Sequence, residues 1–261
     1  MLLNETGFTF GGVHSRRDMG LLYVEKEGHI AIPEIKRNSY QIAGMSGTLL
    51  LSGETWQPFN LEGSLYPAEE PRTQAEAQAL LRDISAWLTA GRQQLIFDYE
   101  PDIFYMAELS ATSKWTLRNW FGGELQIRFL VQPYAYNVEE HSATVTATTG
   151  TTSVQLPLAV QTGLPAPLKL TIENNGSAAI TGVSCRDITL QDMRLTRGQK
   201  LEITSEPPAG ATIGSSSALQ YATAFAPVYL DNGVNTLRVS LTSEAGGTHS
   251  AVITASARGR W

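Results

Sequence analysis

The sequence predicts a mainly β protein with two domains: an N-terminal β-sandwich-like domain that carries one α-helix and a β-hairpin, and a C-terminal antiparallel β-sandwich. Three observations predict this fold class. Short apolar runs alternate with turn residues early in the chain, one stretch has helical periodicity, and the chain after residue 138 repeats strand and turn signals with no helical period. At 261 residues the chain is long enough for two domains of ordinary size.

The first seventy residues contain short β-like runs separated by turn residues. Glycines at positions 28, 44, 47, 53 and 63 lie between or beside these runs, which is typical of strands joined by turns. The predicted strands are Leu21–Glu25, Ile30–Ile35, Thr48–Ser52 and Phe59–Tyr66.

One amphipathic helix is predicted over residues 73–90. Thr73 and Glu76 form a capping box, in which each side chain can satisfy the free backbone N–H of the other residue. Gly91 follows at the position where a left-handed C-terminal cap is expected. The apolar residues that recur at helical spacing are Ala77, Leu80, Leu81, Ile84, Trp87 and Leu88.

Three further strands are predicted after the helix. Gln94–Asp98 and Ile103–Ser110 are apolar-rich runs joined by the sequence YEPD, whose proline presets the backbone dihedral angle that a turn needs. Glu124–Val131 alternates strictly between polar and apolar residues, which predicts a half-buried strand that stops at Gln132–Tyr136. The residues expected on its buried face are Leu125, Ile127, Phe129 and Val131.

The rest of the chain is predicted to form the C-terminal sandwich. The segment LKLTIE, residues 168–173, alternates apolar and polar side chains. The sequences NNG at 174–176 and DNG at 231–233 are typical of tight turns between strands. Because the composition changes near Asn137 with no long linker, we expect domains over residues 1–137 and 138–261.

Composition and charge argue against several classes of protein. Cys185 is the only cysteine, so no internal disulfide forms, and we interpret it as a buried strand residue. The net charge of −6 argues against a protein that holds nucleic acid by its phosphates. The N-terminus lacks the pattern of a signal peptide, and no uninterrupted apolar run of about 18 residues predicts a membrane span.

Three carboxylates at alternate positions raise the question of chemistry: Asp98, Glu100 and Asp102. A calcium loop needs more oxygen ligands and usually a glycine, whereas a proline lies in the middle of this turn. A glycosidase needs carboxylates on opposite walls of a cleft, which one short turn cannot supply. We therefore interpret the trio as the solvated tip of a hairpin, with metal binding and catalysis as less favoured alternatives.

Other residue types with chemical potential form no complete motif. The sequence AGMSGTL around Ser46 lacks a glycine that a nucleophile elbow needs, and GSSS at 214–217 has no lysine for a phosphate loop. Trp115, Trp120 and Phe121 can stack on sugars, although lids on a small core or subunit contacts are favoured. We expect no catalytic residue, no cofactor and no metal. The histidines, none at metal-ligand spacing from another, are His14, His29, His141 and His249.

The order of these segments resembles the distal tail proteins of long-tailed bacteriophages, the siphophage Dit family. The resemblance covers nearly the whole chain and includes FTFGGVHSRRDMGLLYV, IAGMSGTL, the helix ending in ISAWL, LIFDYEPDIFYMAEL, IRFLVQPYAY, FAPVYLDNGVNTLRV and the closing Arg260-Trp261. The glycine hairpin departs from the family pattern, because Ala43 replaces its proline and Met45 and Ser46 replace its charged pair.

This resemblance implies a structural protein that is not an enzyme. In that family the N-terminal domain assembles into a six-fold ring, and a galectin-like sandwich lies outside it. The ring joins the tail tube protein to the tail-associated hub and fibre protein and can hold receptor-binding proteins, while DNA passes through its bore without specific binding. We therefore expect a homo-hexamer in the tail of a phage or prophage virion, present in the host bacterial cytoplasm during assembly.

The subunit contact is expected in the glycine hairpin of about residues 37–53. A closed ring covers exposed strand edges without leaving a free end. Ile42, Leu49 and Leu51 are the hairpin residues predicted at this contact. Two alternatives stay open: a carbohydrate-binding, lectin-like module that acts through residues 138–261 in host-surface adhesion, and a glycoside hydrolase or esterase.

Overall fold

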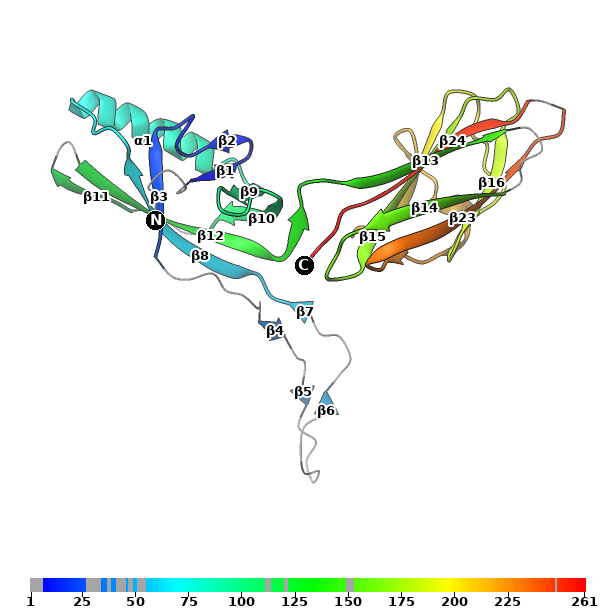
Figure 1. The fold of residues 1–261 in the computed structure, drawn as a ribbon, viewed down its shortest axis with the longest axis horizontal. Helices are drawn as coiled ribbons and strands as arrows, with labels where there is room; N and C mark the ends of the chain where they lie inside the picture. Colours follow the sequence, from blue (N-terminus) through cyan, green and yellow to red (C-terminus); the bar gives the residue numbers. More distant parts are fainter. Residues whose placement is uncertain are drawn as a thin grey trace. The chain divides into compact units, whose positions relative to one another are not determined.

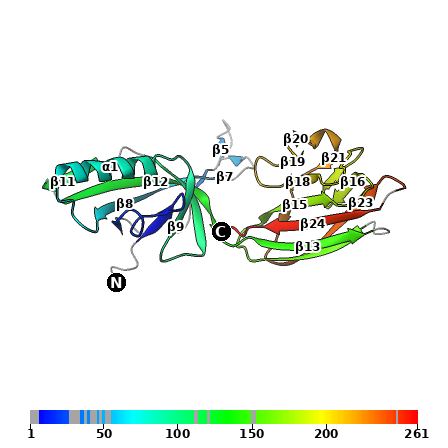
Figure 2. The same cartoon turned by 90° about the horizontal axis from the view of Figure 1, so that it is seen from above.

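The chain divides into two compact units, which we describe separately. In the computed structural model, unit 1 is Met1–Tyr136 and unit 2 is Asn137–Trp261 (Figures 1 and 2). The predicted fold class is confirmed: the protein is mostly β, with antiparallel sheets and a single α-helix in the described part. The structure describes residues 7–26, 34–36, 39–40, 46, 49–50, 55–110, 114–119, 122–148, 153–246 and 248–261.

Unit 1 is built on an eight-stranded sheet that curls into a half-barrel. Its strands are β1 (Phe8–Phe10), β2 (Val13–His14), β3 (Leu21–Glu25), β8 (Phe59–Pro67), β9 (Gln93–Phe97), β10 (Ile103–Leu109), β11 (Lys114–Asn119) and β12 (Gly122–Asn137). The order is β2-β1-β9-β10-β12-β8-β3, and β11 pairs with β12. The ring of Tyr23 in β3 nevertheless lies 5.1 Å from the ring of Phe8 in β1. The curl therefore brings strands from opposite halves of the sheet together.

The bounds of several predicted strands are confirmed. The strand β3 has the predicted bounds, and the predicted ends of β8, β9 and β10 differ from the observed ends by one residue or less. The expected stop of β12 at Gln132–Tyr136 is wrong, because the strand continues to Asn137. Its pairing with β8 ends at Val131 opposite Phe59, so Pro133 lies beyond that ladder and its missing N–H costs no bond there. The predicted buried face of β12 is confirmed for Leu125, Ile127, Phe129 and Val131.

The helix α1 (Gln74–Leu88) covers the core of unit 1, and Figure 2 shows it alongside the strands of the sheet. The predicted cap is confirmed in part. The hydroxyl of Thr73 accepts the N–H of Glu76 at 3.2 Å, but the carboxylate of Glu76 accepts the N–H of Arg72 instead of that of Thr73. Gly91 has φ of +83°, as a left-handed C-terminal cap requires.

The buried face of α1 packs on β1 through one tryptophan. The indole of Trp87 stacks on Phe8 with ring centroids 5.5 Å apart, and its Nε1–H donates to the carbonyl of Phe10 at 2.8 Å. Because a buried N–H needs a partner, this bond fixes the helix against the strand. The other buried residues of the helix are Ala77, Ile84 and Leu88, while Leu80 and Leu81 are half-buried.

Between β3 and β8, two short pairs of strands are nested. The outer pair is β4 (Ile35–Lys36) with β7 (Thr55–Trp56), and the inner pair is β5 (Ser39–Tyr40) with β6 (Leu49–Leu50). This nesting is the arrangement of one long hairpin. Of the strands predicted at 30–35 and 48–52, positions 30–33, 48 and 51–52 lie outside the described residues.

Unit 2 is a sandwich of a seven-stranded and a five-stranded sheet. The seven strands are β13 (His141–Thr148), β24 (Ser250–Ala257), β15 (Ala166–Asn174), β18 (Lys200–Thr204), β19 (Gly210–Ile213), β20 (Ser216–Ser217) and β22 (Tyr229–Leu230). The five strands are β14 (Ser153–Val160), β23 (Gly233–Ser243), β16 (Ile180–Cys185), β17 (Ile188–Leu190) and β21 (Ala222–Phe225). A short 3-10 helix, η2 (Leu219–Tyr221), precedes β21.

The alternation predicted for residues 168–173 is confirmed, because Leu168, Leu170 and Ile172 of β15 are buried. The NNG sequence at 174–176 follows β15 and leads to β16, which lies in the other sheet. Asn174 is fully buried at this crossing, and its amide donates to two backbone carbonyls at 2.8 Å. The DNG turn also crosses between the sheets, from β22 to β23.

Candidate functional site

The predicted subunit contact lies in the nested hairpin. Leu49 is in β6, opposite Tyr40 of β5. Ile42 and Leu51 lie outside the described residues, as do Trp120 and Phe121. The contact therefore stays a prediction.

The three carboxylates of the β9–β10 turn have three different environments. Asp98 is half-buried and contacts the imidazole of His14. Glu100 is half-buried and accepts the phenol O–H of Tyr105 at 3.2 Å. Asp102 is exposed. The prediction of a solvated tip is therefore correct for Asp102 and wrong for Asp98, because the pairing of β1 with β9 brings a histidine to that end of the turn.

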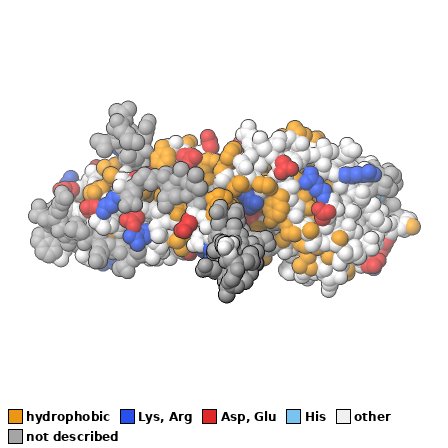
Figure 3. Space-filling view, turned by 90° about the horizontal axis from the view of Figure 1, so that it is seen from below, with side chains coloured by type: hydrophobic (Ala, Val, Ile, Leu, Met, Phe, Trp, Pro, Cys, Tyr) orange, Lys and Arg blue, Asp and Glu red, His pale blue; other side chains and the backbone are white. Residues whose placement is uncertain are grey.

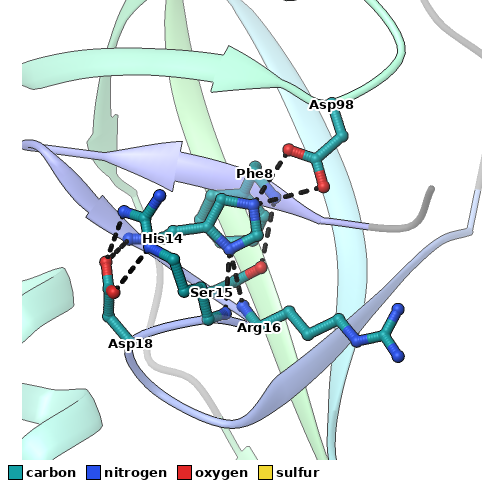
Figure 4. A network of polar contacts seen from close by, with 7 residues as sticks. Phe8, His14, Ser15, Arg16, Asp18 and Asp98 are labelled. Carbon is teal, nitrogen blue, oxygen red and sulfur yellow. Dashed lines mark hydrogen bonds and ion pairs between the residues drawn. The ribbon is translucent and has the colours of Figure 1, made fainter. Parts of the chain in front are cut away.

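His14 and Asp98 meet although they are 84 positions apart in the chain (Figure 4). The Nε2 atom of His14 lies 3.0 Å and 3.3 Å from the two carboxylate oxygens of Asp98. Its Nδ1 atom accepts the backbone N–H groups of Arg16 and Arg17 at 3.1 Å and 3.0 Å. Two donors aimed at Nδ1 require a lone pair there, so the ring proton lies on Nε2 and is donated to Asp98.

The loop after β2 is tied to the same histidine by Asp18. A carboxylate oxygen of Asp18 accepts the backbone N–H of His14 at 2.8 Å, and the guanidinium of Arg17 donates to both oxygens. The hydrogen bonds from Arg17 and then from His14 hold the pKa of Asp18 well below its usual range. Gly7 lies beside the carboxylate of Asp98. A Cβ atom at position 7 would be 2.4 Å from a carboxylate oxygen, so a larger residue there would displace that carboxylate.

A histidine between an aspartate and a serine suggests nucleophilic catalysis, but the geometry opposes it. In a serine hydrolase the second ring nitrogen is directed at the nucleophile, and here both ring nitrogens already have partners. The hydroxyl of Ser15 is fully buried and accepts the N–H of Phe8 at 3.1 Å. The His14–Asp98 network is thus a brace that joins the β1–β2 hairpin to the β9–β10 turn. No local sequence signal marks this pair.

Cys185 lies in β16 and is 1% exposed, as predicted. Burial raises the pKa of its thiol, which opposes nucleophilic reactivity. Within the described residues, no three side chains of His, Cys, Asp or Glu form a group that could hold a metal ion. In the same part of the chain, no helix has the length and apolar character to cross a membrane.

Comparison with known proteins identifies a shared fold. No family model and no curated protein matches the chain. Among solved structures, the chain is similar to the crystal structure of the Dit protein of phage SPP1, with a TM-score of 0.62 and 13% sequence identity. The match covers 98% of each chain, and that protein is described as a paradigm of the hub adsorption apparatus of phages that infect Gram-positive bacteria. The chain therefore has a Dit-like fold over nearly its whole length.

Proposed function

We propose that this chain is a structural component of a phage tail, a homo-hexameric ring adaptor in the baseplate that joins the tail tube to the hub and fibre. The match over 98% of both chains carries the proposal, because it includes both units and not one common module. In this proposal unit 1 forms the ring and unit 2 is a galectin-like sandwich outside it. The adaptor works by assembly and catalyses no reaction.

The charge of unit 1 suits a bore through which DNA passes. Unit 1 contains 16 acidic and 11 basic residues, so a bore lined by it would repel phosphates instead of binding them. On the face drawn in Figure 3, the acidic and basic side chains of the described residues are interspersed. Neither observation favours a protein that grips nucleic acid.

The edge of the unit 1 sheet at β3 supports a contact between subunits of a ring. The strand β3 is the last in the sheet order, and Val24 on it is 48% exposed. An exposed edge with an apolar side chain favours pairing with another chain. In a closed ring each copy would cover the edge of the next, with the hairpin of residues 37–53 adding apolar contact.

The outward faces of four strands in unit 2 do not favour the lectin-like alternative. The outward side chains of β13, β15, β18 and β24 are mainly Ser, Thr, Lys and Glu, without an aromatic ring on which a sugar could stack. Trp115 lies in β11 of unit 1 and not in unit 2.

Native mass spectrometry of the purified chain tests the proposal. We expect a hexamer for the wild type and folded monomers for Ile42→Asp, Leu49→Asp and Leu51→Asp, because a carboxylate at an apolar contact loses its hydration. The matched control is Val234→Asp in unit 2, where the valine is 73% exposed, and it should remain hexameric. Hexamers in all three hairpin variants would refute the assigned contact, and a monomeric wild type would refute the ring.

A further inference from the structure

The strand β13 of unit 2 is a long strand at the edge of its sheet. It pairs with β24 in an unbroken antiparallel register, from His141 opposite Ala257 to Thr148 opposite Ser250 (Figure 2). Within the described part of the chain, no strand pairs with its other side. Such an edge offers a row of backbone N–H and C=O groups to a further strand, so proteins usually protect their edges.

The other edge strands of unit 2 are protected, and β13 is not. The strands β20 and β22 have two residues each, and β21 has four. The strand β14 has eight residues, as β13 does, but it contains Pro157, and proline on an edge strand opposes further pairing. The sequence of β13, HSATVTAT, contains no proline, lysine or carboxylate, and its register shows no bulge. The edge of β13 is therefore open to pairing.

The backbone groups on the free side of β13 belong to its polar residues. In β15, the N–H of Leu168 donates to the carbonyl of Val228 at 2.9 Å and its carbonyl accepts the N–H of Ser205 at 2.9 Å, so neither group faces β24. Leu168 lies opposite Ala257 of β24, which lies opposite His141 of β13. Because backbone groups alternate between the two sides of a strand, Ala257 bonds His141, and the next residue of β13 faces away from β24. The residues whose N–H and C=O groups face the free edge are Ser142, Thr144, Thr146 and Thr148.

The hydrophobic core of unit 2 is incompletely covered along the same edge. Ala143 and Val145 of β13 pack against this core but are only half-buried. The residues opposite them in β24, Ala255 and Ile253, are fully buried. A further strand beside β13 would place its own apolar side chains next to Ala143 and Val145, and so would remove their exposed area from water.

The strand β24 shows which chemistry complements β13. Its sequence, SAVITASA, has mostly hydroxyl side chains on one face and small or aliphatic ones on the other. Arg258 follows it, and its guanidinium lies 3.4 Å from the carboxylate of Glu140, just before β13. The neighbouring Glu139 is exposed and makes no ion pair with any residue that the structure describes. A strand on the free side that runs in the direction of β24 would bring a cation at its end toward Glu139.

We propose that the free edge of β13 binds an extended segment of a partner protein, which joins the sheet as an antiparallel strand. The segment alternates hydroxyl and small apolar side chains and ends in Lys or Arg. Its backbone bonds supply the affinity, and the alternation and the terminal cation supply the specificity. A second copy of this chain fits less well. Two β13 strands would pair about a two-fold axis, whereas neighbours in the proposed ring, on which this step rests, are related by a six-fold rotation.

Hydrogen exchange of the full chain, read by mass spectrometry, tests this site. The probe is the peptide SAVITASAR, the sequence of residues 250–258, capped at both ends. Its control is the same peptide with proline in place of the threonine, which removes one backbone donor and cannot complete the ladder. We expect the probe, and not the control, to slow amide exchange in residues 141–148, because the four outward N–H groups become bonded.

Variants of the chain locate the contact, with affinity measured by fluorescence anisotropy of the labelled probe. Thr144→Pro removes an N–H that faces away from β24 and should weaken binding by about tenfold or more. The matched control Thr144→Ser keeps that N–H and should bind as the wild type does. Glu139→Gln should weaken binding by up to about fivefold, the size of one exposed ion pair. Circular dichroism checks that each variant is folded, and if Thr144→Pro is not, the proline-containing peptide decides.

Three results would overturn the proposal: no slowing of exchange in residues 141–148, equal slowing by the two peptides, or full binding by a folded Thr144→Pro variant. Native mass spectrometry tests the second copy as the occupant. A wild-type assembly with twice the mass of the Thr144→Pro assembly would replace the partner segment with another copy of this chain. A monomer that binds the probe would refute the ring and support the edge, and a hexamer that ignores the probe would do the reverse.

Discussion

The two units stabilise their sheets with different kinds of hydrophobic core. The core of unit 1 is rich in aromatic residues: Phe8, Phe10, Tyr23, Trp87, Phe97 and Phe129 are all buried in it. The buried core of unit 2 is made of aliphatic residues with one Met and one Cys, and among the described residues it contains no buried aromatic ring.

This difference follows from the architecture. The two sheets of unit 2 face each other, and face-to-face sheets about 10 Å apart are filled by interdigitating aliphatic side chains. Unit 1 has a single curled sheet with a helix over it, and aromatic side chains from β1, β3, β9 and α1 meet in the space that they enclose. Large rings fill that space, and their edge-to-face contacts add specific geometry.

The largest expected effect comes from truncating one core at a time. Phe8→Ala should destabilise unit 1 by about 3–5 kcal/mol, and Leu170→Ala should destabilise unit 2 by about 2–5 kcal/mol, because each leaves a cavity. Both side chains are fully buried. Differential scanning calorimetry should show two transitions, of which each variant lowers one. A single transition that both variants lower equally would mean that the two cores unfold together.

The next largest expected effect comes from removing the hydrogen bond between Trp87 of α1 and the carbonyl of Phe10. Trp87→Phe keeps an aromatic ring but removes the donor to the Phe10 carbonyl, which is left without its bond in a buried site. We expect a loss of about 1–3 kcal/mol in chemical denaturation, confined to the unit 1 transition. An unchanged midpoint would show that ring packing alone fixes the helix.

Alkaline pH should weaken unit 1 through the half-buried phenol of Tyr105. Burial and Glu100 raise the pKa of Tyr105 from its ordinary value of 10.0 to about 12. As the pH rises above 10, the unfolded chain releases this proton while the folded chain keeps it, so the stability present below pH 10 falls as the pH approaches 12. In Tyr105→Phe the melting temperature of unit 1 should depend less on pH over this range. An identical pH dependence would exclude a role for this phenol.

The smallest effect compares two aspartates of one turn. Asp98→Ala removes the acceptor for the His14 N–H and should cost about 1 kcal/mol, whereas Asp102→Ala at an exposed position should cost less than about 0.5 kcal/mol. Urea denaturation of the two variants side by side measures the difference. Equal losses would mean that the His14–Asp98 contact contributes nothing beyond a surface charge.

Local sequence patterns predicted the positions of individual helices and strands. The alternation around Leu170 placed β15 correctly, and the spacing after Thr73 placed α1, because each pattern reports one face of one element. The end of β12 was not predictable, since whether Pro133 interrupts a strand depends on where the partner strand begins.

Contacts between distant segments could not be predicted in the same way. Nothing near His14 indicates Asp98, because the contact follows from the pairing of β1 with both β2 and β9. The contact between the rings of Tyr23 and Phe97 likewise requires the curl of the sheet. The NNG sequence at 174–176 matched a tight turn, but the following strand lies in the other sheet.

Negative-stain electron microscopy of the purified full chain tests the central claim most directly. If the chain is a ring adaptor, class averages will show closed rings with six-fold symmetry and a central opening. Uniform single particles of the size of one 28.4 kDa chain would contradict it.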